Sequence, residues 1–157
     1  MNNSRTIKAP FPIEYRDKQY PTVFLAGSIE MGVAENWQEM IDRELPREVV
    51  IFNPRRDDWD SSWVQSIENK QFKEQVDWEL NALDEADLIA LYFDPATKSP
   101  ISLLELGLYA QSGGMVVCCP DGFWRKGNVE IVCDRYKIPL TDNKKDFVKI
   151  IKERLKL

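Results

Sequence analysis

The 157-residue sequence predicts an α/β protein, a three-layer sandwich around a mainly parallel sheet of about five strands. The first observation behind this prediction is a set of short apolar runs without polar alternation, typical of strands buried on both faces of a parallel sheet. The second is that segments with helical spacing separate these runs, so strands and helices alternate and right-handed crossovers are favoured. The four runs are residues 23–26, 49–52, 88–93 and 115–119.

Three helices are predicted between the runs, because apolar residues recur there about one helical turn apart. Pro100 favours the first turn of the third helix. The residues with this spacing are Trp37, Ile41 and Leu45 in the first helix, Phe72, Val76, Leu80 and Leu83 in the second, and Leu104 and Leu108 in the third.

The two ends of the chain give weaker patterns. Residues 131–136 fit a short helix, residues 137–140 a fifth strand and residues 146–157 a closing amphipathic helix. Residues 1–20 are expected to form an extended N-terminal arm laid over the protein. The length suits one domain with a sizeable core, which we place at residues 21–157.

Charge and composition exclude several classes of function. The chain has 21 Lys and Arg against 26 Asp and Glu, a formal net charge of -5 that repels nucleic-acid polymers and anionic membranes. It contains no histidine, which excludes imidazole bases, imidazole metal ligands and His-containing triads. Chemistry in this chain must therefore use carboxylates, hydroxyls, thiols, amines or the backbone.

The cysteines indicate a reducing environment. Cys118, Cys119 and Cys133 show no CxxC spacing, which argues against a zinc site or a disulfide framework. Cys118 and Cys119 stand in an apolar run and are expected to be inert core residues. No apolar stretch approaches a membrane span and the first ten residues are too polar for a secretory signal, so we expect a cytoplasmic protein.

In an open parallel sheet, ligands bind beyond the carboxyl ends of the strands, which directs attention to the loops that follow each apolar run. The loop after the first run, residues 27–32, contains neither a dinucleotide-binding fingerprint nor a phosphate-binding loop. Gly27 would let the backbone approach a ligand, and the Ser28 hydroxyl could donate a hydrogen bond to it. An ordinary tight turn explains the same residues equally well.

The loop at residues 53–63 combines two arginines, three aspartates and two tryptophans. Exposed tryptophan is unfavourable unless something flat covers it, and a nucleobase would suit such a surface by stacking and by hydrogen bonds to its edge. Simple packing is the alternative. The candidate binding residues in this loop are Asn53, Arg56, Asp58 and Trp59.

Glu105 stands among leucines one turn into the third predicted helix, after Ser99 and Pro100. A buried carboxylate costs several kcal/mol unless it is paired or hydrogen-bonded, so the position suggests a chemical task. A glutamate near a helix start also has a structural explanation in the helix dipole. Spacing alone does not choose between these interpretations.

Taken in order, six short segments resemble the nucleoside 2-deoxyribosyltransferase family from about residue 23 to residue 140. They are FLAGS at 24–28, NPRR at 53–56, VDWEL at 76–80, ADL at 86–88, SPISLLELG at 99–107 and GNVE at 127–130. The resemblance implies a flavodoxin-like sandwich that exchanges or hydrolyses the N-glycosidic bond of deoxyribonucleosides or nucleotides without a metal or another cofactor.

The resemblance also implies roles for individual residues. The family's nucleophilic glutamate falls on Glu105, and its acid, eight residues before the aspartate of ADL, falls on Glu79, with Asp77 as a competitor. The family asparagine that a neighbouring subunit lends to the 5′ end of the sugar best matches Asn128. Ser99 is expected to bind substrate, and the protein to be a homo-oligomer.

The sequence departs from the family at three positions. Phe24 stands where many members carry a tyrosine that hydrogen-bonds the catalytic glutamate, and Glu79 stands where many have aspartate. Glu30 occupies the position of an arginine that holds phosphate in relatives acting on monophosphates, so the sequence favours free nucleosides and nucleobases as substrates.

The function expected from these observations is transfer of a 2-deoxyribosyl group between nucleobases through a covalent glycosyl-glutamate. One alternative is a hydrolytic N-glycosidase of nucleosides, nucleotides or NAD-like dinucleotides, for which Arg55, Arg56, Arg125 and Lys126 could hold phosphate. Another is a catalytically silent module that senses nucleotides.

Overall fold

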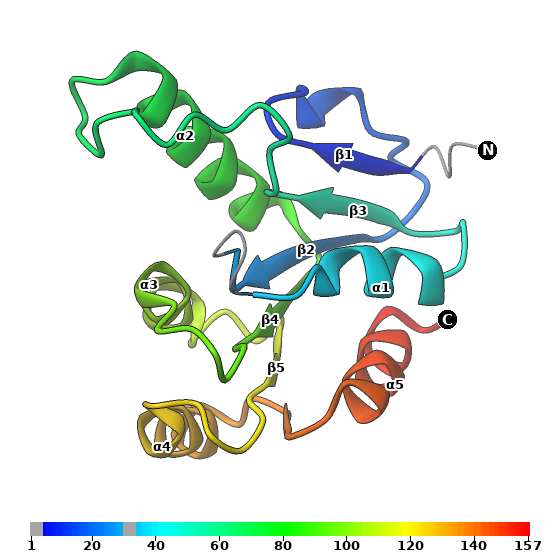
Figure 1. Cartoon of the computed structure of the whole chain (residues 1–157). Helices are drawn as coiled ribbons and strands as arrows, with labels where there is room; N and C mark the ends of the chain where they lie inside the picture. The colour runs from blue at the N-terminus through cyan, green and yellow to red at the C-terminus, as the bar shows by residue number, and fades with distance from the viewer. Residues whose placement is uncertain (1–4, 30–33) are drawn as a thin grey trace.

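Six strands form one parallel sheet between two layers of helices (Figure 1). The structure, a computed structural model, describes residues 5–29 and 34–157. All neighbouring strands are parallel, in the order β1-β3-β2-β4-β5-β6. The strands are β1 (Thr6–Lys8), β2 (Thr22–Gly27), β3 (Val50–Asn53), β4 (Leu88–Tyr92), β5 (Met115–Cys118) and β6 (Leu140–Thr141). This architecture confirms the predicted three-layer α/β class and is consistent with a flavodoxin-like fold.

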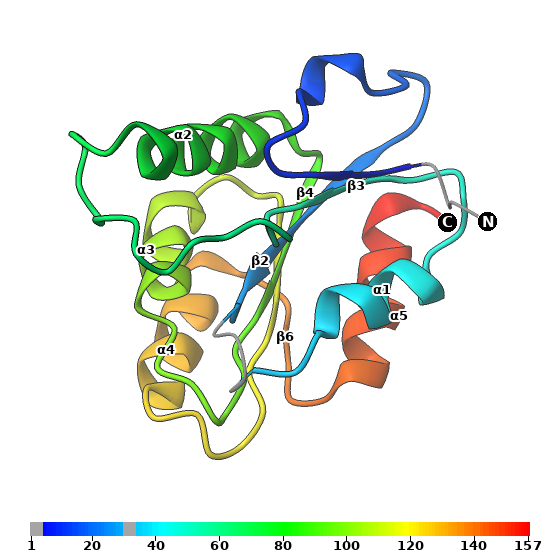
Figure 2. The same ribbon diagram turned by 45° about the horizontal axis from the view of Figure 1, so that its top comes forward.

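The helices divide between the two faces of the sheet, as Figure 2 shows from the side. One face carries α1 (Trp37–Glu44) and α5 (Lys144–Leu155), and the other carries α2 (Lys70–Glu85), α3 (Pro100–Tyr109) and α4 (Lys126–Tyr136). Each layer buries its own apolar cluster against the sheet. In the described part of the chain, no helix is long and apolar enough to cross a membrane.

The N-terminal segment contributes a strand that the apolar pattern did not reveal. β1 pairs with β3, with Ile7 beside Phe52, and a short 3-10 helix (Ile13–Tyr15) leads towards β2. As an edge strand, β1 is only partly buried and carries Thr6 and Lys8, so it has no apolar run to detect. The sheet therefore has six strands, while the division into an arm at 1–20 and a domain at 21–157 stays a prediction.

Helix starts follow local capping chemistry. The side chains of Asn36, Asn69 and Asn143 accept hydrogen bonds from backbone N–H groups in the first turns of α1, α2 and α5. Helix α4 begins five residues before the predicted residue 131. Only Val129 and Cys133 of α4 are buried, so its sequence shows too few apolar positions to mark the start.

The strand order brings three loops together. β2 lies between β3 and β4, so the carboxyl ends of these three strands are neighbours at one edge of the sheet. The segments leading to α2 and α3 leave from the ends of β3 and β4 towards the same face. Glutamates on α2 and α3 are thereby placed on a common side.

Candidate active site

Two carboxyl groups are buried on neighbouring helices. Glu105 on α3 is only 8% exposed, and Glu79 on α2 is partly buried. Burial raises the pKa of Glu79 to about 7 and that of Glu105 to about 8, and the negative charge of Glu79 contributes to the rise at Glu105. The two groups therefore interact electrostatically, and near neutral pH the pair is partly protonated.

The positions of both carboxyls follow from helical periodicity. On α3, Glu105 shares the buried face with Ser102 and Leu106, three residues before it and one after. On α2, Glu79 follows buried Gln75 by four residues, one helical turn. Both glutamates thus occupy positions that a purely structural helix would fill with apolar side chains.

At one of its two carboxyl oxygens, Glu105 lacks, among the described residues, the hydrogen-bond donor that usually compensates for burial. Its Oε2 is enclosed and accepts no hydrogen bond from any residue in the described ranges. Phe24 is fully buried, its ring centroid lies 6.4 Å from that of Trp78, and its side chain has no hydroxyl to donate a hydrogen bond. An enclosed acceptor without a donor costs about 1–3 kcal/mol, a cost expected at a functional site.

Asp77, the competing candidate acid, lies on the outside of α2. Its side chain is exposed and forms an ion pair with Lys73, one turn earlier on the same helix. The charge that acts on Glu105 comes from Glu79. The structure thus brings Glu79 to Glu105 and leaves Asp77 at the surface.

Ser28 and Ser99 belong to a buried cluster of three hydroxyls with Thr97. The oxygen–oxygen distances are 3.0 Å for Ser28–Thr97, 2.5 Å for Ser28–Ser99 and 2.6 Å for Thr97–Ser99. Ser28 Oγ also accepts from the Asp94 N–H at 2.9 Å. The cluster fastens the end of β2 to the loop between β4 and α3, and contact of either serine with substrate stays a prediction.

Ser28→Ala should lower the free energy of unfolding by about 1–3 kcal/mol, because it leaves the buried Asp94 N–H without its acceptor. Urea unfolding at neutral pH measures this change. The same substitution at exposed Ser61 is the control and should leave stability within about 0.5 kcal/mol. Equal stability of the two variants would contradict a fastening role for the cluster.

Gly27 is required by the sheet itself. It has φ of 134°, and a Cβ atom built on it would lie 2.1 Å from the carbonyl oxygen of Tyr92 on β4. Only glycine fits so close to a neighbouring strand. The structure therefore explains Gly27 by packing of the backbone, and its approach to a ligand stays a prediction.

The predicted base-binding loop has most of its polar groups engaged. Asn53 Oδ1 accepts from the Arg55 N–H at 3.0 Å, and Arg56 forms ion pairs with Asp58 at 2.6 Å and Glu74 at 3.3 Å. Trp59 is 39% exposed. Of the residues predicted in this loop, Trp59 therefore offers a partly exposed aromatic surface, and the Asp58 side chain is exposed while paired with Arg56.

An aromatic surface also involves Trp63. The Trp59 and Trp63 rings meet edge to face with centroids 4.9 Å apart, and the Arg56 guanidinium lies 4.9 Å from the Trp63 ring centroid. The sequence indicated exposed tryptophans here, and the structure shows that they pack on each other and that Trp63 also lies against Arg56.

The remaining predicted positions are dispersed. Asn128 lies exposed in the first turn of α4, and Glu30 lies outside the described residues. Of the cations considered for phosphate, Arg55 is buried, Lys126 forms an ion pair with Asp121, and Arg125 lies 4.4 Å from the Trp124 ring centroid. These cations belong to two separate parts of the chain, the loop after β3 and the start of α4.

The cysteines are unsuited to nucleophilic chemistry. All three are buried as free thiols, as predicted for Cys118 and Cys119. Burial raises the pKa of Cys118 and Cys133 to about 11 and that of Cys119 to about 12. In the described ranges, no group of three or more histidine, cysteine or acidic side chains is arranged to hold a metal.

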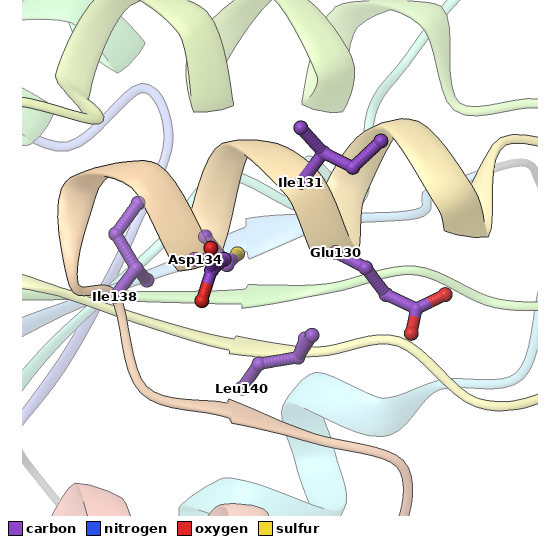
Figure 3. Close-up of a pocket in the computed structure, with 6 residues that line it drawn as sticks. Glu130, Ile131, Asp134, Ile138 and Leu140 are labelled. Carbon is purple, nitrogen blue, oxygen red and sulfur yellow. The ribbon is translucent and has the colours of Figure 1, made fainter.

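A surface hollow of about 510 Å³ lies between α4 and the edge strand β6 (Figure 3). None of the predicted site residues lines it. Its lining residues are Glu130, Ile131, Cys133, Asp134, Ile138 and Leu140. The interacting carboxyls, not this hollow, therefore define the candidate active site.

Comparisons with known proteins agree with this fold. A solved structure described as a conserved protein from Enterococcus faecalis V583 superposes with a TM-score of 0.60 at 15% identity, covering 86% of this chain and 99% of that chain. That similarity shows the fold alone. A search of curated proteins found no match.

The family comparison covers the candidate site. The model described as "Nucleoside 2-deoxyribosyltransferase like" matches residues 20–123, more than half of the chain, a range that contains both Glu79 and Glu105. The chain belongs to the nucleoside 2-deoxyribosyltransferase-like family.

Proposed function

We propose that the protein transfers a 2-deoxyribosyl group from one nucleobase to another, and that Glu105 carries the sugar between the two halves of the reaction. The observation that carries this proposal is the buried, interacting pair of Glu79 and Glu105. Membership of the family supports chemistry at an N-glycosidic bond. Two carboxyls in different environments are the groups that such a bond requires.

In the first half of the reaction, the ionised Glu105 carboxylate attacks C1′ of the deoxyribose. A bond forms between a Glu105 oxygen and C1′, the bond between C1′ and the base nitrogen breaks, and its electron pair stays on that nitrogen. Glu79 supplies a proton that neutralises the leaving base. The sugar is then held as an ester of Glu105.

In the second half, a nitrogen of the incoming base attacks C1′ and the ester oxygen of Glu105 leaves as a carboxylate. Glu79 takes the proton from the incoming base and returns to its starting state. Two successive inversions retain the configuration at C1′. If water attacks instead, the same intermediate yields free deoxyribose and the protein is a hydrolase.

The reaction should have a bell-shaped pH profile centred between about pH 7 and pH 8. The pKa values of Glu79 and Glu105 are raised to about 7 and about 8, so the pair holds one proton between these values. The productive form has that proton on Glu79 and is the less populated of the two one-proton forms, but it stays a constant fraction of them at every pH. Activity is lost below this range as the pair gains a second proton, and above it as the pair loses its last proton. Initial rates of base exchange across the pH range measure the profile, and a rate independent of pH would contradict this assignment.

The loop after β3 is proposed to receive the base. Trp59 offers a partly exposed indole for stacking, and Arg56 with Asp58 presents hydrogen-bonding groups beside it. The proposed substrate-binding residues also include four that shape the surrounding loops: Asn53, Gly27, Ser28 and Ser99.

A homo-oligomer is proposed because α3, the helix that carries Glu105, also bears an uncovered apolar stripe. Ile101, Leu104 and Leu108 are 58%, 57% and 58% exposed and recur along one side of this helix. A neighbouring subunit on this stripe would lie beside the active site, where its Asn128 is proposed to reach the sugar.

Leu104→Glu should therefore convert the oligomer to monomer and reduce activity at least about tenfold, because it places a charge inside the apolar contact. Light scattering with size-exclusion chromatography measures the mass. The control places the same charge at Tyr15, which is also exposed but lies on the 3-10 helix. A monomeric wild-type protein with full activity would contradict the oligomer proposal.

A substrate panel tests the function directly. The protein is incubated with deoxynucleosides, ribonucleosides, their monophosphates and NAD, each with and without a second free base, and released and exchanged bases are separated by chromatography. Deoxynucleosides should exchange their base, and intact-mass spectrometry should detect a deoxyribosyl adduct on the protein. Base release without exchange would identify a hydrolase, and a raised melting temperature without reaction would identify a sensing module.

Replacing each candidate acid on α2 with its uncharged amide tests which of them protonates the leaving base. Glu79→Gln should lower the rate of base exchange by about 10²–10⁴-fold, because it removes the proton donor beside the leaving base. Asp77→Asn removes a carboxylate that lies exposed beside Lys73. A larger loss in Asp77→Asn than in Glu79→Gln would reverse the assignment.

A further inference from the structure

Gln75 is a buried polar side chain on α2 that the sequence pattern did not single out. It is 4% exposed, and its amide nitrogen makes two hydrogen bonds, to Glu79 Oε1 at 2.9 Å and to the carbonyl oxygen of Pro54 at 3.0 Å. An amide nitrogen has two protons, so both are used. The side chain therefore links the acid on α2 to the backbone just beyond the end of β3.

The two acceptors fix the orientation of the Gln75 amide. If the amide turned over, its oxygen would face the Pro54 carbonyl and the Glu79 carboxyl oxygen, and both contacts would become repulsive when Glu79 is ionised. In the present orientation Gln75 Oε1 is enclosed and accepts no hydrogen bond from any residue that the structure describes. An enclosed acceptor without a donor is unfavourable, so packing alone gives no reason for glutamine at this position.

The contact also selects between the two oxygens of Glu79. Because Gln75 donates to Oε1, a proton on that oxygen would compete with the Gln75 N–H for the same position. The acidic proton is therefore directed to Oε2. That oxygen is the one left to exchange a proton with a substrate.

We propose that Gln75 is a positioning residue, which acts through Glu79 by holding Oε1 and leaving Oε2 to carry the proton to and from the nucleobase. This role rests on the proposed function of the carboxyl pair. The anchor on Pro54 has a second consequence, because it holds the carboxyl against the sheet edge when the proton has left and Glu79 is charged.

The hydrogen bond from Gln75 also affects the pKa of Glu79 in a predictable direction. Donation to Glu79 stabilises its ionised form and opposes the effect of burial, which raises the pKa of Glu79. Loss of the donor should therefore raise this pKa further. A cationic donor in its place should lower it.

Carbon-13 NMR titration of the Glu79 carboxyl tests this step without any substrate. The Glu105→Gln background removes the neighbouring titration, and Gln75→Met and Gln75→Lys are compared with glutamine at position 75. We expect Gln75→Met to raise the Glu79 pKa by about one pH unit and Gln75→Lys to lower it by at least as much. A Glu79 pKa that is unchanged in both variants would overturn the proposal.

Kinetics test the positioning role in the intact site. Gln75→Met should reduce kcat at least about tenfold, leave KM within about twofold and move the high-pH limb of the profile upward. Gln75→Lys should recover part of kcat and move that limb downward. Gln71→Met, the same exchange one turn earlier at an exposed position of α2, is the matched control and should behave as wild type.

The outcomes separate this proposal from the proposed function. Wild-type base exchange with an unchanged pH profile and kcat in Gln75→Met would overturn the role of Gln75 and leave the function standing. An inactive wild-type protein would overturn the function, and the NMR titration would still decide whether Gln75 controls the Glu79 carboxyl. Circular dichroism and melting curves of each variant exclude unfolding as the cause of lost activity.

Discussion

Replacing Glu105 with glutamine should reduce base exchange by about 10³-fold or more. Glutamine keeps the size of the side chain and removes the negative charge that attacks C1′, so the covalent sugar ester cannot form. Exchange of the base of a deoxynucleoside with an isotopically labelled free base measures the rate. Intact-mass spectra should show the deoxyribosyl adduct in the wild-type protein and none in the variant.

The matched control for this variant is Glu130→Gln, which makes the same chemical change at an exposed position on α4. It should retain the wild-type rate and the adduct. The Glu105→Gln protein should keep its fold, because the native carboxyl already lacks hydrogen bonds to the described residues at Oε2. Full exchange activity in a folded Glu105→Gln protein would remove this residue from the mechanism.

The elements of the fold that could be predicted are those whose burial produces a pattern of apolar residues in the sequence. Strands β2 to β5 are buried on both faces and appear as apolar runs, and the one-turn apolar spacing of α1 lies on its buried face. In α3 the spacing marked a helix but not its buried face, because Leu104 and Leu108 are exposed. β1 and the start of α4 are exposed or mixed in character, so no pattern of this kind marks them. The apolar pattern therefore misses the edge strand β1 and the first residues of α4.

In the candidate active site, the sequence singled out Glu105, but it did not reveal the contacts made by the residues around it. Glu105 stands among leucines, which made it stand out in the sequence, but its burial is shown only by the structure, because two of those leucines, Leu104 and Leu108, are exposed. Gln75 is an ordinary polar residue in a polar stretch of α2, and its role depends on contacts with Glu79 and Pro54 that only the folded chain shows. Ser28 and Ser99 were recognisable as hydroxyls in the right loops, but their mutual contact depends on how β2 and β4 pair.

Stability should fall as the pH rises from about 4.5 to above 8, in the direction opposite to that of most salt-bridged proteins. In the unfolded chain both glutamates titrate near their ordinary pKa of 4.5, whereas in the folded protein the pKa of Glu79 is about 7 and that of Glu105 about 8. Between these limits the folded state binds more protons than the unfolded state, so the free energy of unfolding decreases with pH. The stabilisation is fully present below about pH 4.5 and is lost as the pH passes through the two folded values.

Other shifted groups act outside this window. The pKa values of Glu35 and Asp58 are lowered, chiefly by hydrogen bonds with Lys144 and Arg56, so their stabilisation is lost only below their ordinary range. The raised pKa values of the three cysteines lie near 11 and 12, above the window. A decline between pH 5 and pH 9 can therefore be assigned to the carboxyl pair.

Urea unfolding at about pH 5, 7 and 9 measures the decline, which should reach several kcal/mol across the window because each pKa unit corresponds to about 1.4 kcal/mol. In the double variant Glu79→Gln/Glu105→Gln the decline should vanish, and the variant should be more stable than wild type at pH 9, where the native protein must hold two charges in a poorly solvated place. Glu130→Gln should follow the wild-type curve. A double variant that declined as steeply as wild type would mean that the two carboxyls titrate like exposed ones, and an active site built on their burial would then have no physical basis.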